Sequence, residues 1–190
     1  MARYGKEHKQ VTRRRIIEAA GRRLKRDGID GSGVATLMAD AGLTNGAFYA
    51  HFDSKDDLVS TTVADQLREQ RETYSAQSFD EIVRGYLSIQ HRDDIEGGCP
   101  SAALLDEIAR SSDAVKRAYT DGQVAITDDV AARLAPDDPQ SLRVQTLSVL
   151  ALMVGTLQLS RALADQRLAD QVLEQGMQNA LALLGRRGQG

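Results

Sequence analysis

The sequence predicts an all-α protein. Only three prolines occur in 190 residues, and the helix-favouring residues Ala, Leu, Arg, Gln and Glu are plentiful. Apolar residues recur at helical spacing along most of the chain, and no segment shows the alternation typical of a half-buried strand. We expect about nine helices, over residues 12–26, 34–41, 44–51, 54–75, 79–90, 101–110, 113–134, 140–164 and 168–184.

The first predicted helix is amphipathic. Arginines occupy one face, and the other carries apolar residues about one turn apart, namely Ile16, Ile17, Ala20 and Leu24. Gly28 is expected to end this helix, because glycine readily adopts the left-handed conformation that follows a helix.

Two short helices follow, with a glycine turn between them. Ser32 or Gly33 is expected to cap the second helix, and Gly42 to end it. Thr44 is a good cap for the third, which runs to about His51. Such close spacing is typical of a helix-turn-helix, whose second member enters the major groove of DNA.

The remaining six helices form a larger body. The pair Asp53-Ser54 opens the fourth helix. Pro100 favours a helix start and Asp113 is expected to cap the next helix. We therefore divide the chain into a DNA-binding domain, 1–53, and a second domain, 54–190.

Charge is distributed unevenly along the chain. Residues 1–26 hold ten Lys and Arg against two Glu, whereas residues 61–190 hold 13 basic and 19 acidic residues, and the net charge is -3. A basic end on an acidic body is expected where one end approaches phosphates. A solvated, disordered basic tail would produce the same asymmetry.

Composition and spacing argue against several other classes. A single cysteine, Cys99, excludes a disulfide framework within the chain and a cysteine zinc site. The histidines His8, His51 and His91 lie far apart, so no metal site is expected. Neither a phosphate-binding lysine loop nor a nucleophile elbow occurs, and Cys99 with His91 alone would make a poor nucleophilic site. We expect no enzyme and no cofactor.

The chain is expected to be cytoplasmic. Its first ten residues contain no apolar core of the kind found in a secretory signal. The longest apolar stretch, 146–159, falls short of the roughly 18 to 20 residues that a membrane span needs.

Residues 42–58, GLTNGAFYAHFDSKDDL, closely resemble the DNA-binding signature of the TetR family of transcriptional repressors. The central pattern Phe-Tyr-x-His-Phe-x-x-Lys-x-x-Leu is specific, and the resemblance extends over residues 12–60. Two residues depart from the family pattern: Gly33 stands where Ser or Thr is usual, and Met38 where Ala is usual. A weaker cap and a tilted helix pair would follow.

The motif predicts the residues that contact DNA. Thr44 and Asn45 can hydrogen-bond base edges, and the methyl group of Ala47 can touch thymine. Tyr49, His51 and Lys55 suit phosphates. The full predicted set is Ser32, Gly33, Thr44, Asn45, Gly46, Ala47, Tyr49, His51 and Lys55.

The resemblance implies a homodimer that binds a palindrome-like operator and is released by a small-molecule effector. Its last two helices would pair with their copies, and helix 140–164 supports this independently because it is apolar nearly all round. A central helix buried inside a monomer would show the same pattern. The predicted interface residues are Leu147, Leu150, Val154, Leu157, Val172, Met177 and Leu181.

An effector pocket is expected between the helices of residues 79–165. Its predicted lining is Tyr86, Ile89, Cys99, Leu104, Ile108, Tyr119, Gln123, Met153 and Leu157, although plain core packing would explain each of them. Cys99 begins a helix, where a thiol can become reactive toward oxidants or electrophiles, or can simply fill space. Two alternatives stay open, namely a DNA-binding regulator without small-molecule input and a small enzyme.

Overall fold

The structure is a computed structural model that describes the backbone of residues 2–185 and the side chains of residues 7–184. The described residues form 10 helices and no strands, which confirms the predicted all-α class. In chain order the elements are α1 (Ala2–Asp27), α2 (Val34–Asp40), the 3-10 helix η1 (Asn45–Ala50), α3 (Lys55–Ser75), α4 (Phe79–Tyr86), α5 (Ile89–Asp93), α6 (Pro100–Arg110), α7 (Asp113–Leu134), α8 (Gln140–Ala162) and α9 (Gln166–Gly185).

Several boundaries follow from local caps. Gly28 ends α1 with φ +79°, and Gly42 ends the α2 turn with φ +65°, both in the left-handed region. The Ser54 side chain accepts a hydrogen bond from the Asp57 N–H and so caps α3. Gly33 caps α2 without a side-chain bond, as its missing side chain dictates.

Other predicted boundaries were wrong. The helix expected over 79–90 is two helices, because Leu87 leaves the helical conformation and Ser88 caps α5 by accepting from the His91 N–H. Ser112 rather than Asp113 is the cap of α7. The segment that precedes residue 12 is helical and extends α1, and the side chains of residues 2–6, including Arg3 and Lys6, lie outside the described set.

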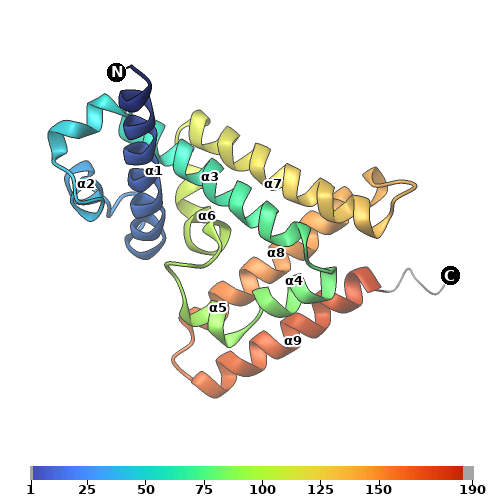
Figure 1. Ribbon diagram of the computed structural model, residues 1–190. Helices are drawn as coiled ribbons and strands as arrows, with labels where there is room; N and C mark the ends of the chain where they lie inside the picture. The colour runs from blue at the N-terminus through green and yellow to red at the C-terminus, as the bar shows by residue number, and fades with distance from the viewer. Residues whose placement is uncertain (1, 186–190) are drawn as a thin grey trace.

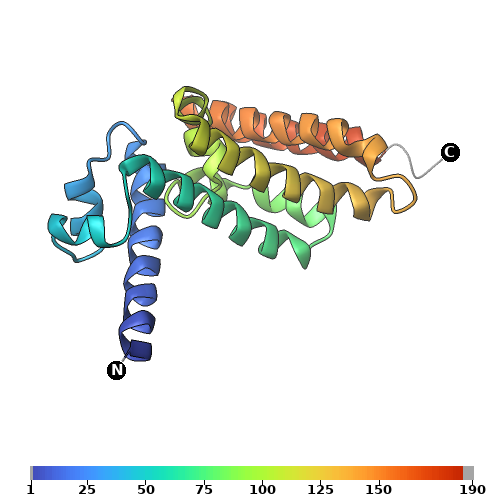
Figure 2. The same cartoon turned by 90° about the horizontal axis from the view of Figure 1, so that it is seen from above.

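The amino-terminal elements α1, α2 and η1, here called the head, stand at one end of the molecule (Figure 1, Figure 2). Large buried side chains from all three elements and from the connection between η1 and α3 hold the head together: Ile16, Leu24, Leu37, Met38, Phe48 and Phe52. The unusual Met38 is fully buried among them, so it fills the space between the helices.

Head and body, where the body is α3–α9, share one hydrophobic cluster. Leu104 and Ile108 of α6 and Val115 of α7 belong to the same cluster as Ile16 and Leu37 of the head. A movement of α6 or α7 therefore bears directly on the head, because close-packed interiors transmit displacements.

Two glycines allow close helix packing in the body. A Cβ atom on Gly122 of α7 would lie 2.8 Å from the Cβ of Leu67 in α3. A Cβ atom on Gly176 of α9 would meet the Thr156 side chain of α8. Both helix pairs are among the most extensive contacts of the fold, and α8 lies beside α9 in both views (Figure 1, Figure 2).

Helix α8 carries more apolar surface than the monomer covers. With 23 residues it is, among the described residues, the one helix long and apolar enough to cross a membrane by length and composition. The apolar stretch 146–159 predicted from the sequence is shorter than this helix. In the structure α8 packs on α7 and α9 and contributes Val149 and Met153 to the core. Only 33% of its apolar window is buried, so an apolar face remains outside.

Candidate nucleic-acid interface and ligand cavity

The short helix η1 presents small and polar side chains to the outside. Thr44, Asn45 and Gly46 are exposed, and Tyr49 is 74% exposed. Phe48 on the opposite side is buried and stacks on Phe52 with ring centroids 5.8 Å apart. The aromatic pair thus anchors η1 in the head while leaving its outer face free to meet another molecule.

The turn before η1 is fastened to α1. The Leu43 N–H donates to Met38 O at 2.9 Å and the Gly42 N–H to Ala39 O at 2.8 Å, which closes the end of α2. Arg15 of α1 donates to Gly42 O at 3.2 Å. Thr44 makes no side-chain cap bond, contrary to its expected role, so its hydroxyl remains available for other partners.

The structure does not place every predicted DNA-contact residue on this surface. Ser32 is fully buried, because its hydroxyl donates to Gly28 O at 2.7 Å inside the α1–α2 connection. Ala47 is half-buried and packs against the core. Lys55 is half-buried and donates to Ile29 O at 2.6 Å, which leaves two of its three ammonium protons for a phosphate.

Positive charge gathers beside η1. Burial lowers the pKa of His51, and the charges of Lys9 and Arg13 lower it further. Arg13 lies over the Phe52 ring at 4.7 Å and donates to Thr61 Oγ1 at 3.3 Å. The sequence predictions named neither Lys9 nor Arg13 as a contact residue, although the basic composition of residues 1–26 was the available signal.

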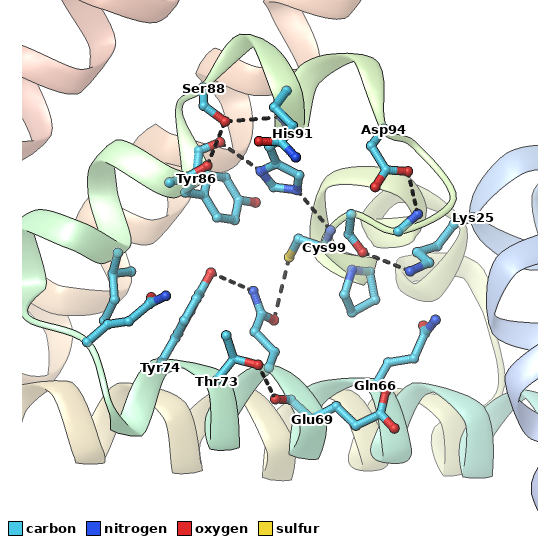
Figure 3. A pocket seen from close by; sticks show the side chains of 18 residues that line it. Lys25, Gln66, Glu69, Thr73, Tyr74, Tyr86, Ser88, His91, Asp94 and Cys99 are labelled. Atoms are coloured by element: carbon cyan, nitrogen blue, oxygen red, sulfur yellow. Dashed lines mark hydrogen bonds between the residues drawn. The ribbon is translucent and has the colours of Figure 1, made fainter.

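A cavity of about 690 Å³ lies where α1, α3, α4, α5 and α6 meet. Figure 3 shows residues from the long helix α3 on one side and from the 86–99 segment on the other. The lining residues are Lys25, Gln66, Glu69, Gln70, Thr73, Tyr74, Gln77, Ile82, Gly85, Tyr86, Ser88, Gln90, His91, Asp94, Gly97, Gly98, Cys99 and Pro100.

Of the nine predicted pocket residues, only Tyr86 and Cys99 line this cavity. Ile89 is 52% exposed because α5 begins a separate helix there, and Met153 lines a much smaller neighbouring space. The others pack in the cores or beside the buried Ser101: Leu104, Ile108, Tyr119, Gln123 and Leu157. Apolar periodicity had identified core positions rather than the more polar cavity wall.

Cys99 is held in place by hydrogen bonds. Its backbone N–H donates to His91 Nε2 at 3.0 Å, and its thiol donates to Gln70 Oε1 at 3.6 Å. His91 Nδ1 lies 2.7 Å from the Tyr86 carbonyl oxygen, so Nδ1 carries the proton and the ring is neutral. The thiol bonds to an amide and the imidazole to the backbone, so the pair is not arranged as a nucleophile with its base.

The predicted dimer residues are divided between the core and the surface. Val154 and Leu157 are buried inside the monomer, whereas the other five are half-buried. The exposed large apolar residues of α8 and α9 are different ones: Val144, Leu159, Leu168 and Leu183.

Comparison with known proteins agrees with this geometry. The model of the family described as bacterial regulatory proteins, tetR family, matches residues 16–61, which span most of the head and the start of α3. The HTH-type transcriptional regulator TtgR of Pseudomonas putida is 38% identical over 84 residues, which cover 43% of this chain and 40% of TtgR. The HTH-type transcriptional repressor AcnR of Corynebacterium efficiens is 26% identical over 148 residues, 77% of each chain.

A solved structure extends the likeness over the whole fold. The TetR-family transcriptional regulator from Cytophaga hutchinsonii superposes with a TM-score of 0.72 at 18% identity, covering 92% of this chain and 96% of that one. The match with TtgR spans less than half of that protein's length. The motif, the helix-turn-helix geometry and the family match agree that residues 16–61 form a DNA-binding head of the kind found in the TetR family of bacterial regulatory proteins, and the described fold is similar to that of a TetR-family regulator.

Proposed function

We propose that the protein is a ligand-responsive repressor of transcription that acts in the cytoplasm. It binds a palindrome-like DNA operator as a homodimer and is released by a small molecule. The observation that carries the proposal is the exposed face of η1, anchored by buried Phe48 and flanked by the basic residues of α1. A repressor among the relatives, AcnR, supports the direction of regulation.

The DNA contacts divide into base reading and phosphate binding. Thr44 and Asn45 hydrogen-bond base edges, and Gly46 allows close approach because nothing lies within 4 Å of where its Cβ would be. Tyr49, His51 and Lys55 bind phosphates, joined by Arg13 and Lys9 from α1. Ser32 takes no part through its buried side chain.

The outer face of α8 supports the homodimer. Val144 is 73% exposed and Leu159 is 53% exposed, and the smaller Ala151 and Gly155 are exposed between them. These residues follow one another at helical spacing, so they form one stripe that a second copy of the helix can cover. The half-buried Leu147 and Leu150 would border this stripe, whereas Val154 and Leu157 stabilise each monomer.

The cavity supports ligand control over constitutive binding. A volume of about 690 Å³ lies within the range of small-molecule sites, and the wall includes α1 of the head as well as α3. A ligand releases DNA only if it binds better to the arrangement in which the two heads are wrongly spaced. A regulator without small-molecule input would need no such space.

The test is selection of bound duplexes from a random pool, followed by affinity measurements on the selected site. Asn45→Ala should change sequence preference, whereas Lys55→Ala should weaken binding to all duplexes and reduce the salt slope by about one unit. Equal losses on every sequence would exclude base reading by Asn45. A purified protein that is monomeric and binds no duplex at low salt would refute the proposal.

A further inference from the structure

The cavity contains a lysine without an acid partner. Lys25 of α1 is half-buried, and its ammonium donates to Gly98 O at 2.9 Å. Among the described side chains no carboxylate lies within ion-pair distance of it. Burial lowers the pKa of Lys25 and outweighs the opposite effect of the nearby carboxylates Asp94 and Glu69, so the charge is poorly solvated. Two ammonium protons remain for a ligand.

The surroundings of Lys25 favour one added negative charge. Helix α6 starts at Pro100 in the cavity wall, so the positive end of its dipole lies there. Arg161 lies behind the same segment and donates to the His91 and Arg92 carbonyls, again without a described acid partner. Glu69 is already paired with Arg14, and Asp94 accepts from the Gly97 N–H.

These charges suit a carboxylate better than a phosphate. Phosphate sites usually gather arginines or several backbone N–H groups around a doubly charged group. Here the cavity itself offers a single cation, and the negative charges of Glu69 and Asp94 at its edge would repel a dianion. A monoanion is repelled less than a dianion by these two carboxylates, and it matches the one ammonium of the described lining, which has no carboxylate within ion-pair distance.

Tyr86 adds an independent sign of a ligand. Its side chain is only 4% exposed, and its hydroxyl faces the weakly hydrogen-bonding Cys99 thiol and has no nitrogen or oxygen partner among the described residues. Figure 3 shows its ring directed into the space in front of Cys99 and Tyr74. Most buried hydroxyls are paired, as Tyr119 is with Ser101 at 3.0 Å. An unpaired one at a cavity wall is available to a bound molecule.

The rest of the wall defines the body of the ligand. Gln66 Oε1 is also buried without a partner, whereas Gln70 already bonds to Tyr74 and Cys99. The rings of Tyr74 and Pro100 offer apolar contact beside these polar groups. A ring-containing molecule with a hydrogen-bonding substituent satisfies both kinds of surface.

We propose that this cavity binds an organic monocarboxylate, with the carboxylate on Lys25 and a hydroxyl or similar polar group on Tyr86. The inference rests on the proposed function and names the chemical class of its effector. It also provides a direct route to the head, because Lys25 belongs to α1. A carboxylate bound to the two remaining ammonium protons draws the Lys25 side chain toward the ligand and so weakens its bond to Gly98 O. The contact between α1 and the 94–99 loop, which the Arg26–Glu96 ion pair reinforces, then loosens.

The test is calorimetric titration of the full chain with matched probes of two lengths. The probes are 4-hydroxyphenylacetate and 6-hydroxy-2-naphthoate, their primary amides, and the parent acids without the hydroxyl. At least one acid should bind about tenfold or more tightly than its amide. Lys25→Met should abolish that preference, and Lys25→Arg should retain it. Lys116→Met, which removes an exposed lysine that is not part of the lining, should leave it unchanged.

Tyr86 is tested by a second pair of variants. Tyr86→Phe should lose the preference for hydroxylated acids and raise the melting temperature, because the buried hydroxyl is unpaired in the free protein. Tyr119→Phe removes a paired hydroxyl, so it should lower the melting temperature and leave probe binding intact. A loss of binding in Tyr86→Phe through misfolding would appear as a lower melting temperature and would contradict the assignment.

Three outcomes would overturn the inference: equal binding of acids and amides, an acid preference that survives Lys25→Met, or no binding by any acid. Operator binding is measured separately on the same samples. Acid binding that depends on Lys25 in a protein that binds no duplex would support the cavity assignment and refute the proposed function. Operator binding without acid binding would support the proposed DNA binding and refute the cavity assignment.

Discussion

Gly122 allows α3 and α7 to pack at a distance that a larger residue does not permit. In Gly122→Ala the new Cβ would lie 2.8 Å from both Cβ and Cδ1 of Leu67, so the helices must separate by about 0.6 Å to reach ordinary contact. Leu67 is fully buried and has no free space to move into. Overpacking of this kind costs about 1–3 kcal/mol.

A gain in helix propensity opposes that cost. Alanine is favoured over glycine in a helix interior by about 1 kcal/mol. The net change is therefore a loss of about 1 kcal/mol and at most about 2 kcal/mol. For a chain of this size, each 1 kcal/mol lowers the melting temperature by roughly 2–4 °C.

Gly85→Ala is the matched control. A Cβ at Gly85 meets nothing within 4 Å, so the same substitution in α4 should raise stability by about 0.5–1 kcal/mol. Urea unfolding followed by circular dichroism, at one protein concentration, measures both variants. The reasoning about the α3–α7 contact fails if Gly122→Ala is as stable as Gly85→Ala.

Three further predictions concern charge and assembly. Burial and neighbouring cations lower the pKa of His51 in the free protein, and bound phosphates should raise it. DNA affinity should therefore rise as pH falls from about 7.5 to 6, and this pH dependence should disappear in His51→Gln. Burial also lowers the pKa of His91, so the folded state favours the neutral ring. The contribution of His91 to stability is complete above the unfolded pKa of about 6.5 and is lost as pH falls through the lower folded value. Urea unfolding should therefore show a free energy of unfolding that decreases as pH falls through this range, and His91→Gln should reduce that decrease. Leu159→Glu places a charge on the exposed α8 stripe, so sedimentation should show monomers with unchanged helix content, and a dimer that persists would exclude this face.

Local rules were sufficient for much of the fold. Gly28 and Gly42 end helices through left-handed backbone, and Ser54 caps α3 through its own side chain. Each device depends on residues within one helical turn, so the sequence displays it directly. The break at Leu87 and Ser88 was missed because the apolar pattern continues across it, although Ser88 was a visible cap signal.

The interior assignments were less accurate. Leu104 and Ile108 have the apolar spacing of a core-facing helix, and they do face a core, but it is the one shared with the head. Leu157 is apolar on a helix expected to meet a partner, yet the monomer itself buries it. Periodicity indicates that a residue is covered, and it does not indicate by which element.

By itself the sequence determined the helical class, the position of the helix-turn-helix and most of the outward-facing residues around η1, because these depend on neighbours within a few positions. Only the tertiary structure decided that Lys25 and Gln70 join Tyr86 and Cys99 in the wall of one cavity, that Ser32 is buried, and that Lys55 is tied to Ile29 O. These residues meet through helices packed from distant parts of the chain. Burial and pairing depend on that packing, which sequence spacing alone does not specify.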